Sequence, residues 1–212
     1  MRILDKGLLI ESMFHPNSFH HGRVGLNRIE NNNNMLKKYS IAIPLNSEAY
    51  NFAKKCQQRL HNSLSISSIL INNSDPHINL IAGSTNNIDN VIGLLHKTSF
   101  KHKQFTDFIG LGVLLTPDPL IYMRFTNSVF LRELRKYLFT KTLPFWDTLN
   151  NSVDDDVWIP KSTLAYKDLS LNELSKALLC LEKINIKCRM EITELSVIEF
   201  TENEREVVRI NI

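Results

Sequence analysis

The sequence predicts one α+β domain, and three observations support that class. Apolar residues make up 43% and charged residues 22% of the 212 residues, a balance typical of soluble globular proteins. Short β-type runs alternate with amphipathic helical runs along the chain. Adjacent β-type runs at 107–126 and 188–212 are joined by short turns, which predicts antiparallel hairpins.

We expect residues 1–38 to form an irregular N-terminal extension and residues 39–212 to form a single domain of two related halves. The extension holds His15, His20 and His21 among Pro, Gly and a run of Asn. No acidic or Cys partner stands at ligand spacing, so these histidines favour a polar loop over a metal site.

Hydrophobic periodicity orders the first half of the domain. We expect a strand at 39–45, a helix begun by Asn46 or Ser47, strands at 65–71 and 77–82, and a helix at 88–95. The first helix carries one apolar stripe at steps of three and four, formed by Ala49, Phe52, Ala53, Cys56 and Leu60.

Hydrophobic periodicity also predicts the elements of the second half of the domain. We expect strands at 107–115 and 120–126, a helix begun by Asn127 or Ser128, a loop at 150–156, a strand at 162–166, a helix from Ser170 to about Ile184, and strands at 188–200 and 206–212. Ser170 and Glu173 form a capping box. The periodicity of the helix after Ser128 places Phe130, Leu131, Leu134 and Leu138 inward and Arg132, Arg135 and Lys136 outward.

Cysteines, apolar runs and charge limit the class of protein further. Cys56, Cys180 and Cys188 form no CxxC pair, so we expect three reduced thiols, at least two of them in the core. The longest apolar stretch, around 110–115, is too short to span a membrane, and charges near the N-terminus break any signal-peptide core. This predicts a cytosolic protein. Residues 1–106 carry 12 Lys and Arg against 6 Asp and Glu, which favours a phosphate-bearing partner.

Two segments of the chain echo each other. PHINLIA at 76–82 and PKSTLAY at 160–166 both read Pro, a basic residue, any residue, a small polar residue, then Leu. Residues i and i+2 of a strand point to the same face. His77 with Asn79, and Lys161 with Thr163, would therefore form a groove that suits one phosphate, with cations to offset its charge and an amide and a hydroxyl to hold its oxygens.

At these residues the sequence resembles the two-histidine phosphoesterase superfamily, which includes 2'-5' RNA ligases and 2',3'-cyclic phosphodiesterases. Its mark is a pair of His-x-Thr/Ser motifs, each followed by an apolar residue, and the resemblance covers about 38–212. It implies a duplicated, two-lobed fold with antiparallel sheets around a central groove and helices outside. It also implies acid–base chemistry by the two histidines without a metal or other cofactor, with the hydroxyls gripping the phosphate.

Two of the four motif positions depart from the family pattern. Asn79 replaces Thr or Ser but can still donate to a phosphate oxygen. Lys161 replaces the second His, and a lysine with a reference pKa of about 10.4 is charged at neutral pH. It acts as a general acid only if burial or a nearby cation lowers its pKa, and otherwise serves as a fixed positive charge.

These departures leave three functions open. The first is a protein that binds a nucleotide or an RNA end with a terminal or cyclic phosphate, and that has weak or altered 2',3'-cyclic or 2'-5' phosphodiesterase activity. The second is a non-catalytic nucleotide- or RNA-binding or regulatory module with a vestigial active site. The third is an interaction protein with a vestigial groove that functions through residues 1–38. Tyr122, Arg124 and Tyr166 are candidate contacts for a base or a second phosphate. We expect no membrane partner, and a monomer by default.

Overall fold

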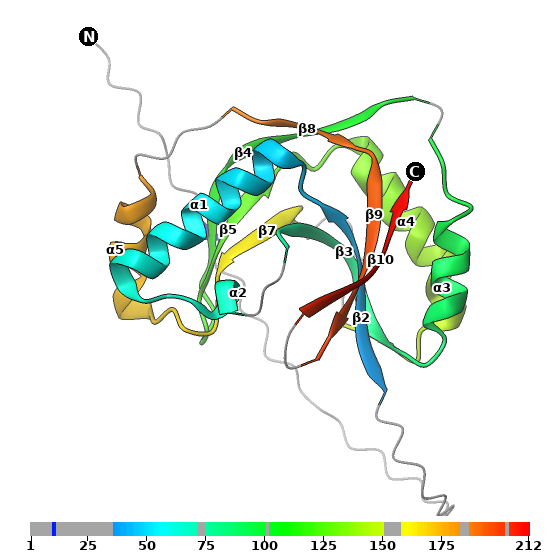
Figure 1. Ribbon diagram of the computed structural model, residues 1–212, viewed down its shortest axis with the longest axis horizontal. Coiled ribbons are helices and arrows are strands. Elements are labelled where there is room, and N and C mark those ends of the chain that lie inside the picture. The colour runs from blue at the N-terminus through cyan, green and yellow to red at the C-terminus, as the bar shows by residue number, and fades with distance from the viewer. Residues whose placement is uncertain are drawn as a thin grey trace, which may run out of the picture.

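The computed structural model describes residues 10–11, 36–71, 75–100, 102–150, 158–182, 187–201 and 204–212. Within these ranges the chain forms two sheets that face each other, with helices on their outer sides (Figure 1). The predicted α+β class is therefore confirmed. Among the helices of these ranges, none has the length and apolar character that a membrane span needs.

The first sheet, called sheet A, is antiparallel except for its β1–β4 pair. Its strands are β1 (Ile10–Glu11), β4 (Gln104–Leu114), β5 (Leu120–Phe125), β7 (Lys161–Ala165) and β8 (Arg189–Ile192). The second, sheet B, is antiparallel in the order β10-β9-β2-β3-β6. Its strands are β2 (Lys37–Pro44), β3 (His77–Thr85), β6 (Thr148–Leu149), β9 (Glu194–Phe200) and β10 (Glu204–Asn211).

Helices α1 (Ser47–Leu64) and α5 (Leu171–Leu181) lie together on the outer side of sheet A (Figure 1). Asn46 begins α1 by accepting a hydrogen bond from the Ala49 N–H at 3.2 Å. The expected stripe of α1 is buried, and its Phe52 ring lies 5.2 Å from that of Phe108 on β4. The predicted capping box at Ser170 begins α5.

Helices α3 (Ile88–Leu95) and α4 (Val129–Thr142) cover the outer side of sheet B (Figure 1). Ser128 begins α4, as expected, and Leu131, Leu134 and Leu138 are buried. The outward placement of Arg135 is wrong, because this residue is only 3% exposed. Helical periodicity predicts that a long cationic side chain at this position is exposed. Here the carbonyl oxygen of Leu80 and the ring of Trp158 compensate for the burial of the guanidinium.

Two further expectations about strands are wrong. The strand at 65–71 is replaced by the short helix α2 (Ser68–Ile71). The carboxylate of Asp168 accepts hydrogen bonds from the backbone N–H groups of Ser67 and Ser68 at 2.6 and 2.7 Å, which stabilises a helical turn from outside it. The single strand at 188–200 divides at Thr193, where the chain passes from sheet A to sheet B as β8 and β9.

The cysteines follow their expectation. Cys56 and Cys188 are buried free thiols, and Cys180 is partly buried. Burial raises the pKa of Cys56 to about 12.

Strands β3 and β7 share an irregularity that the echoing segments did not reveal. In β3, Asn79 pairs with Ala42 and Ile81 with Ile41, so Leu80 is an additional residue. In β7, Thr163 pairs with Tyr122 and Ala165 with Ile121, so Leu164 is additional. Both leucines are fully buried. Each motif is therefore followed at once by a β-bulge, a feature that redirects the side chains around it.

Candidate functional site

A pocket of about 370 Å³ lies where the two sheets meet. Strand β7 forms one end of sheet A, and β3 lies beside it in sheet B (Figure 1). The two echoing segments thus come from different sheets and flank one cavity.

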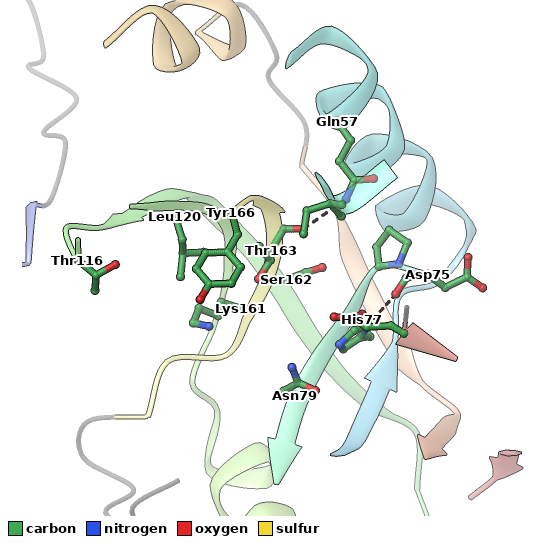
Figure 2. Close-up of a pocket in the computed structure, with 13 residues that line it drawn as sticks. Gln57, Asp75, His77, Asn79, Thr116, Leu120, Lys161, Ser162, Thr163 and Tyr166 are labelled. Carbon is green, nitrogen blue, oxygen red and sulfur yellow. Dashed lines mark hydrogen bonds between the residues drawn. The ribbon is translucent and has the colours of Figure 1, made fainter. Parts of the chain in front are cut away.

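The pocket is lined by His77 and Asn79 from β3 and by Lys161 and Thr163 from β7 (Figure 2). All four side chains are half-buried, whereas the Leu80 and Leu164 side chains that follow them are in the core. The expected convergence of these residues is therefore what the structure shows.

Tyr166 also lines the pocket, but the other two candidate contacts, Tyr122 and Arg124, do not. Tyr122 is 3% exposed and packs against Gly112 on β4, where a Cβ atom would lie 2.3 Å from its ring. Sequence reasoning did not identify the remaining lining residues, which are Gln57, Ile69, Asp75, Pro76, Thr116, Leu120, Ser162 and Glu204.

The ring orientation of His77 is set by its own chain. Its Nδ1 lies 2.7 Å from the carbonyl oxygen of Asp75 (Figure 2). A carbonyl oxygen can only accept, so this contact places a proton on Nδ1, and in the neutral ring it leaves Nε2 as the proton acceptor. The Asp75 carboxylate in turn accepts from the Tyr50 hydroxyl at 3.1 Å. The local backbone thus selects the tautomer that a general base needs.

Lys161 occupies the position of the second basic residue. Burial lowers the pKa of its ammonium group below the ordinary value, because desolvation disfavours the charged form. Burial is one of the two conditions that allow a lysine to transfer a proton near neutral pH, and a nearby cation is the other.

Two amides complete the inner wall of the pocket. Figure 2 shows the side-chain nitrogen of Asn79 on the side of the pocket that faces Lys161. The Nε2 of Gln57, which is 2% exposed, donates to the carbonyl oxygen of Thr163 at 3.4 Å and so ties β7 to α1. Gln57 could have been identified from the sequence, because it is a polar residue that directly follows Cys56 on the apolar stripe of the helix.

The described residues contain no group of three or more His, Cys, Asp or Glu that could hold a metal ion. His15, His20 and His21 lie outside the described residues, so the expectation for them is not tested.

Solved structures share this architecture. The crystal structure of TT0787 of Thermus thermophilus superposes with a TM-score of 0.56 at 9% sequence identity, covering 82% of this chain and 97% of that one. E. coli LigT complexed with 3'-AMP gives 0.53 at 14%, covering 84% and 99%. LigT has also been crystallised with ATP and with NADP+, at 13% identity in each case.

This chain has the LigT-like fold. At these identities the likeness establishes the fold alone, and it confirms the fold that the resemblance to two-histidine phosphoesterases predicted. No protein-family model matches the sequence, and no curated protein matches it. The pattern at 76–82 and 160–166 was therefore the sequence signal for this architecture.

Proposed function

We propose that this chain is a two-histidine phosphoesterase-like protein that binds a nucleotide or an RNA end through a terminal or cyclic phosphate. The observation that carries the proposal is the convergence of His77, Asn79, Lys161 and Thr163 in one pocket. The complexes of LigT with 3'-AMP, ATP and NADP+ support a nucleotide ligand for this fold.

In the bound state the phosphate lies between the two strands. The Lys161 ammonium offsets its charge, and the Thr163 hydroxyl and the Asn79 amide donate to its oxygens. Tyr166 lines the same pocket and offers an aromatic face to the attached base.

The catalytic form of the proposal is slow hydrolysis of a 2',3'-cyclic phosphodiester. Nε2 of His77 takes a proton from water, the water oxygen forms a bond to phosphorus, and the bond from phosphorus to one ribose oxygen breaks. The protonated Lys161 gives its proton to that leaving oxygen. An ammonium group is a weaker acid than an imidazolium, so the step is slower than with two histidines, even though burial lowers the Lys161 pKa.

The alternative is a non-catalytic nucleotide-binding or regulatory module. Lys161 at the second basic position favours it, because the positive charge of a lysine can hold a phosphate even where no proton is transferred.

Binding is tested first, by calorimetric titration of the full chain with 3'-AMP. We expect Lys161→Ala to weaken binding by roughly ten- to 100-fold, as for loss of a charge-assisted hydrogen bond. Lys136→Ala is the matched control, because Lys136 is exposed on α4 outside the pocket. If the wild type binds neither 3'-AMP nor inorganic phosphate, the proposed function is wrong.

Turnover separates the two forms of the proposal. A panel of 2',3'-cyclic nucleotides and 2'-5' oligonucleotides is incubated with the wild type and with His77→Ala. Slow hydrolysis that His77→Ala abolishes supports the enzyme. Binding without hydrolysis of any substrate in the panel supports the binding module.

A further inference from the structure

We infer that Arg135 is a positioning residue that couples the two phosphate-binding strands, and this role rests on the proposed function. The residue lies on α4, outside the pocket, and is 3% exposed. A guanidinium is always charged, so burying it requires compensation from its neighbours. Two of these neighbours are close in sequence to the two motifs, since Leu80 directly follows Asn79 and Trp158 shortly precedes Lys161.

The first neighbour is the bulge of β3. Nε of Arg135 donates to the carbonyl oxygen of Leu80 at 3.0 Å, in a buried hydrogen bond. Leu80 is the additional residue of that bulge and directly follows Asn79. The direction of the side chains beside a bulge depends on its backbone conformation. By holding this carbonyl, Arg135 fixes how Asn79 and His77 enter the pocket.

The second neighbour is the segment that leads into β7. The guanidinium carbon of Arg135 lies 5.2 Å from the ring centroid of Trp158, a cation–π distance. Trp158 is followed by Ile159 and Pro160, and then by Lys161. The carbonyl of Pro160 accepts from the Phe125 N–H at 2.9 Å, so this segment already belongs to the sheet A ladder. Stacking on Trp158 therefore fixes the point from which Lys161 extends.

One side chain makes both contacts because of its shape. A planar guanidinium donates from its edge while its face lies on an aromatic ring. Lysine has neither the fixed edge nor the flat face, and glutamine lacks the charge. A displacement of Arg135 would thus move the donors from β3 and the cation from β7 relative to each other.

The test measures the dissociation constant for 3'-AMP by calorimetry, at a temperature where circular dichroism shows each variant to be folded. We expect Arg135→Gln and Arg135→Lys to bind about tenfold more weakly or worse, since small misplacements of binding groups are costly. Trp158→Leu should weaken binding similarly, and Trp158→Phe, which keeps a ring, should restore most of it. Lys136→Gln, on the exposed side of the same helix, is the control and should bind as the wild type does.

A double-mutant cycle separates coupling from general damage. If Arg135 couples the strands through both Leu80 and Trp158, Arg135→Gln in the Trp158→Leu background should cause a further loss, through the Leu80 contact, that is smaller than its loss in the wild-type background. Fully additive losses would show that Arg135 and Trp158 act independently and would refute the coupling. Variants that unfold more readily yet bind 3'-AMP like the wild type would show that Arg135 only stabilises the fold. If Arg135→Gln does not fold, Arg135→Lys and the two Trp158 variants still decide the question.

A readout that needs no ligand keeps this inference distinct from the proposed function. The His77 ring resonances are followed by NMR in the wild type, Trp158→Leu and Lys136→Gln. If these resonances shift from their wild-type positions in Trp158→Leu but not in Lys136→Gln, the two strands are coupled. This result would support the inference even if the wild type binds no phosphate and the proposed function fails. Unchanged His77 resonances in Trp158→Leu would refute it.

Discussion

Replacing Lys161 by histidine would restore two imidazoles to the pocket between β3 and β7. We expect Lys161→His to hydrolyse 2',3'-cyclic nucleotides faster than the wild type. The structure supports this because Lys161 and His77 already line one cavity from facing strands. A histidine at position 161 would start from the same backbone, held by the Gln57 contact to Thr163.

The size of the gain follows from what a lysine still supplies. A well-placed general acid contributes about 10²–10⁴-fold. Lys161 retains part of that contribution, since burial lowers its pKa toward the working range of an acid. Asn79 would remain in place of Thr or Ser. We therefore expect a gain of roughly tenfold to 100-fold in kcat, which is no more than the smallest full contribution of a general acid.

The assay measures kcat and KM for a 2',3'-cyclic nucleotide from pH 5 to pH 10. In the wild type, activity should fall on the alkaline side as Lys161 loses its proton, below the ordinary lysine pKa of about 10.4. In Lys161→His the alkaline limb should move toward the histidine value of about 6.5. Adding His77→Ala to Lys161→His should remove the gain, because the two groups act as a unit.

Rapid turnover by the wild type that is lost in Lys161→His would refute this reasoning. It would mean that the lysine is the better acid in this pocket and that the site is adapted to it.

Two further predictions concern stability. Gly112→Ala should lower the free energy of unfolding by about 1–3 kcal/mol, since a Cβ there would lie 2.3 Å from the Tyr122 ring. Gly93→Ala, in α3 with nothing within 4 Å, should instead raise it by about 0.5–1 kcal/mol, and urea unfolding of both variants checks the contrast. Glu199 is buried and pairs with Lys37 at 3.0 Å, and the hydrogen bond from Lys37 lowers the pKa of its carboxyl. Its contribution is therefore present above the unfolded pKa of about 4.3 and lost as pH falls through the lower folded value. Glu199→Gln should be less stable than the wild type at pH 7, and the difference should shrink toward pH 3. An equal difference at both pH values would contradict the assignment.

The side chains that each motif strand turns toward the pocket could be predicted from one local rule, whereas the meeting of the two strands was implied by the family resemblance. Alternation along a strand places His77 with Asn79, and Lys161 with Thr163, whatever the rest of the fold does. Capping chemistry at Ser128 and Ser170 is equally local, and both helices begin there.

The features that could not be predicted from the sequence depend on partners that are distant along the chain. The helical turn at 68–71 is stabilised by Asp168, about 100 residues away, so no local window could reveal it. Arg135 is buried because the Leu80 carbonyl and the Trp158 ring meet it there. Gln57 lines the pocket because α1 lies against β7, a matter of tertiary packing.

The passage of the chain between the sheets at Thr193 affects how the molecule assembles. Sheet B pairs Tyr39 on β2 with Glu199 on β9, and sheet A pairs β4 with β8, so each sheet needs at least one strand from residues 189–211. Pairings of such long sequence separation form late and make folding slow and cooperative. A nascent chain that lacks β8–β10 has neither sheet complete. A fragment without these strands should therefore lack the pocket between β3 and β7, which Glu204 of β10 also lines, and with it the phosphate binding that we propose.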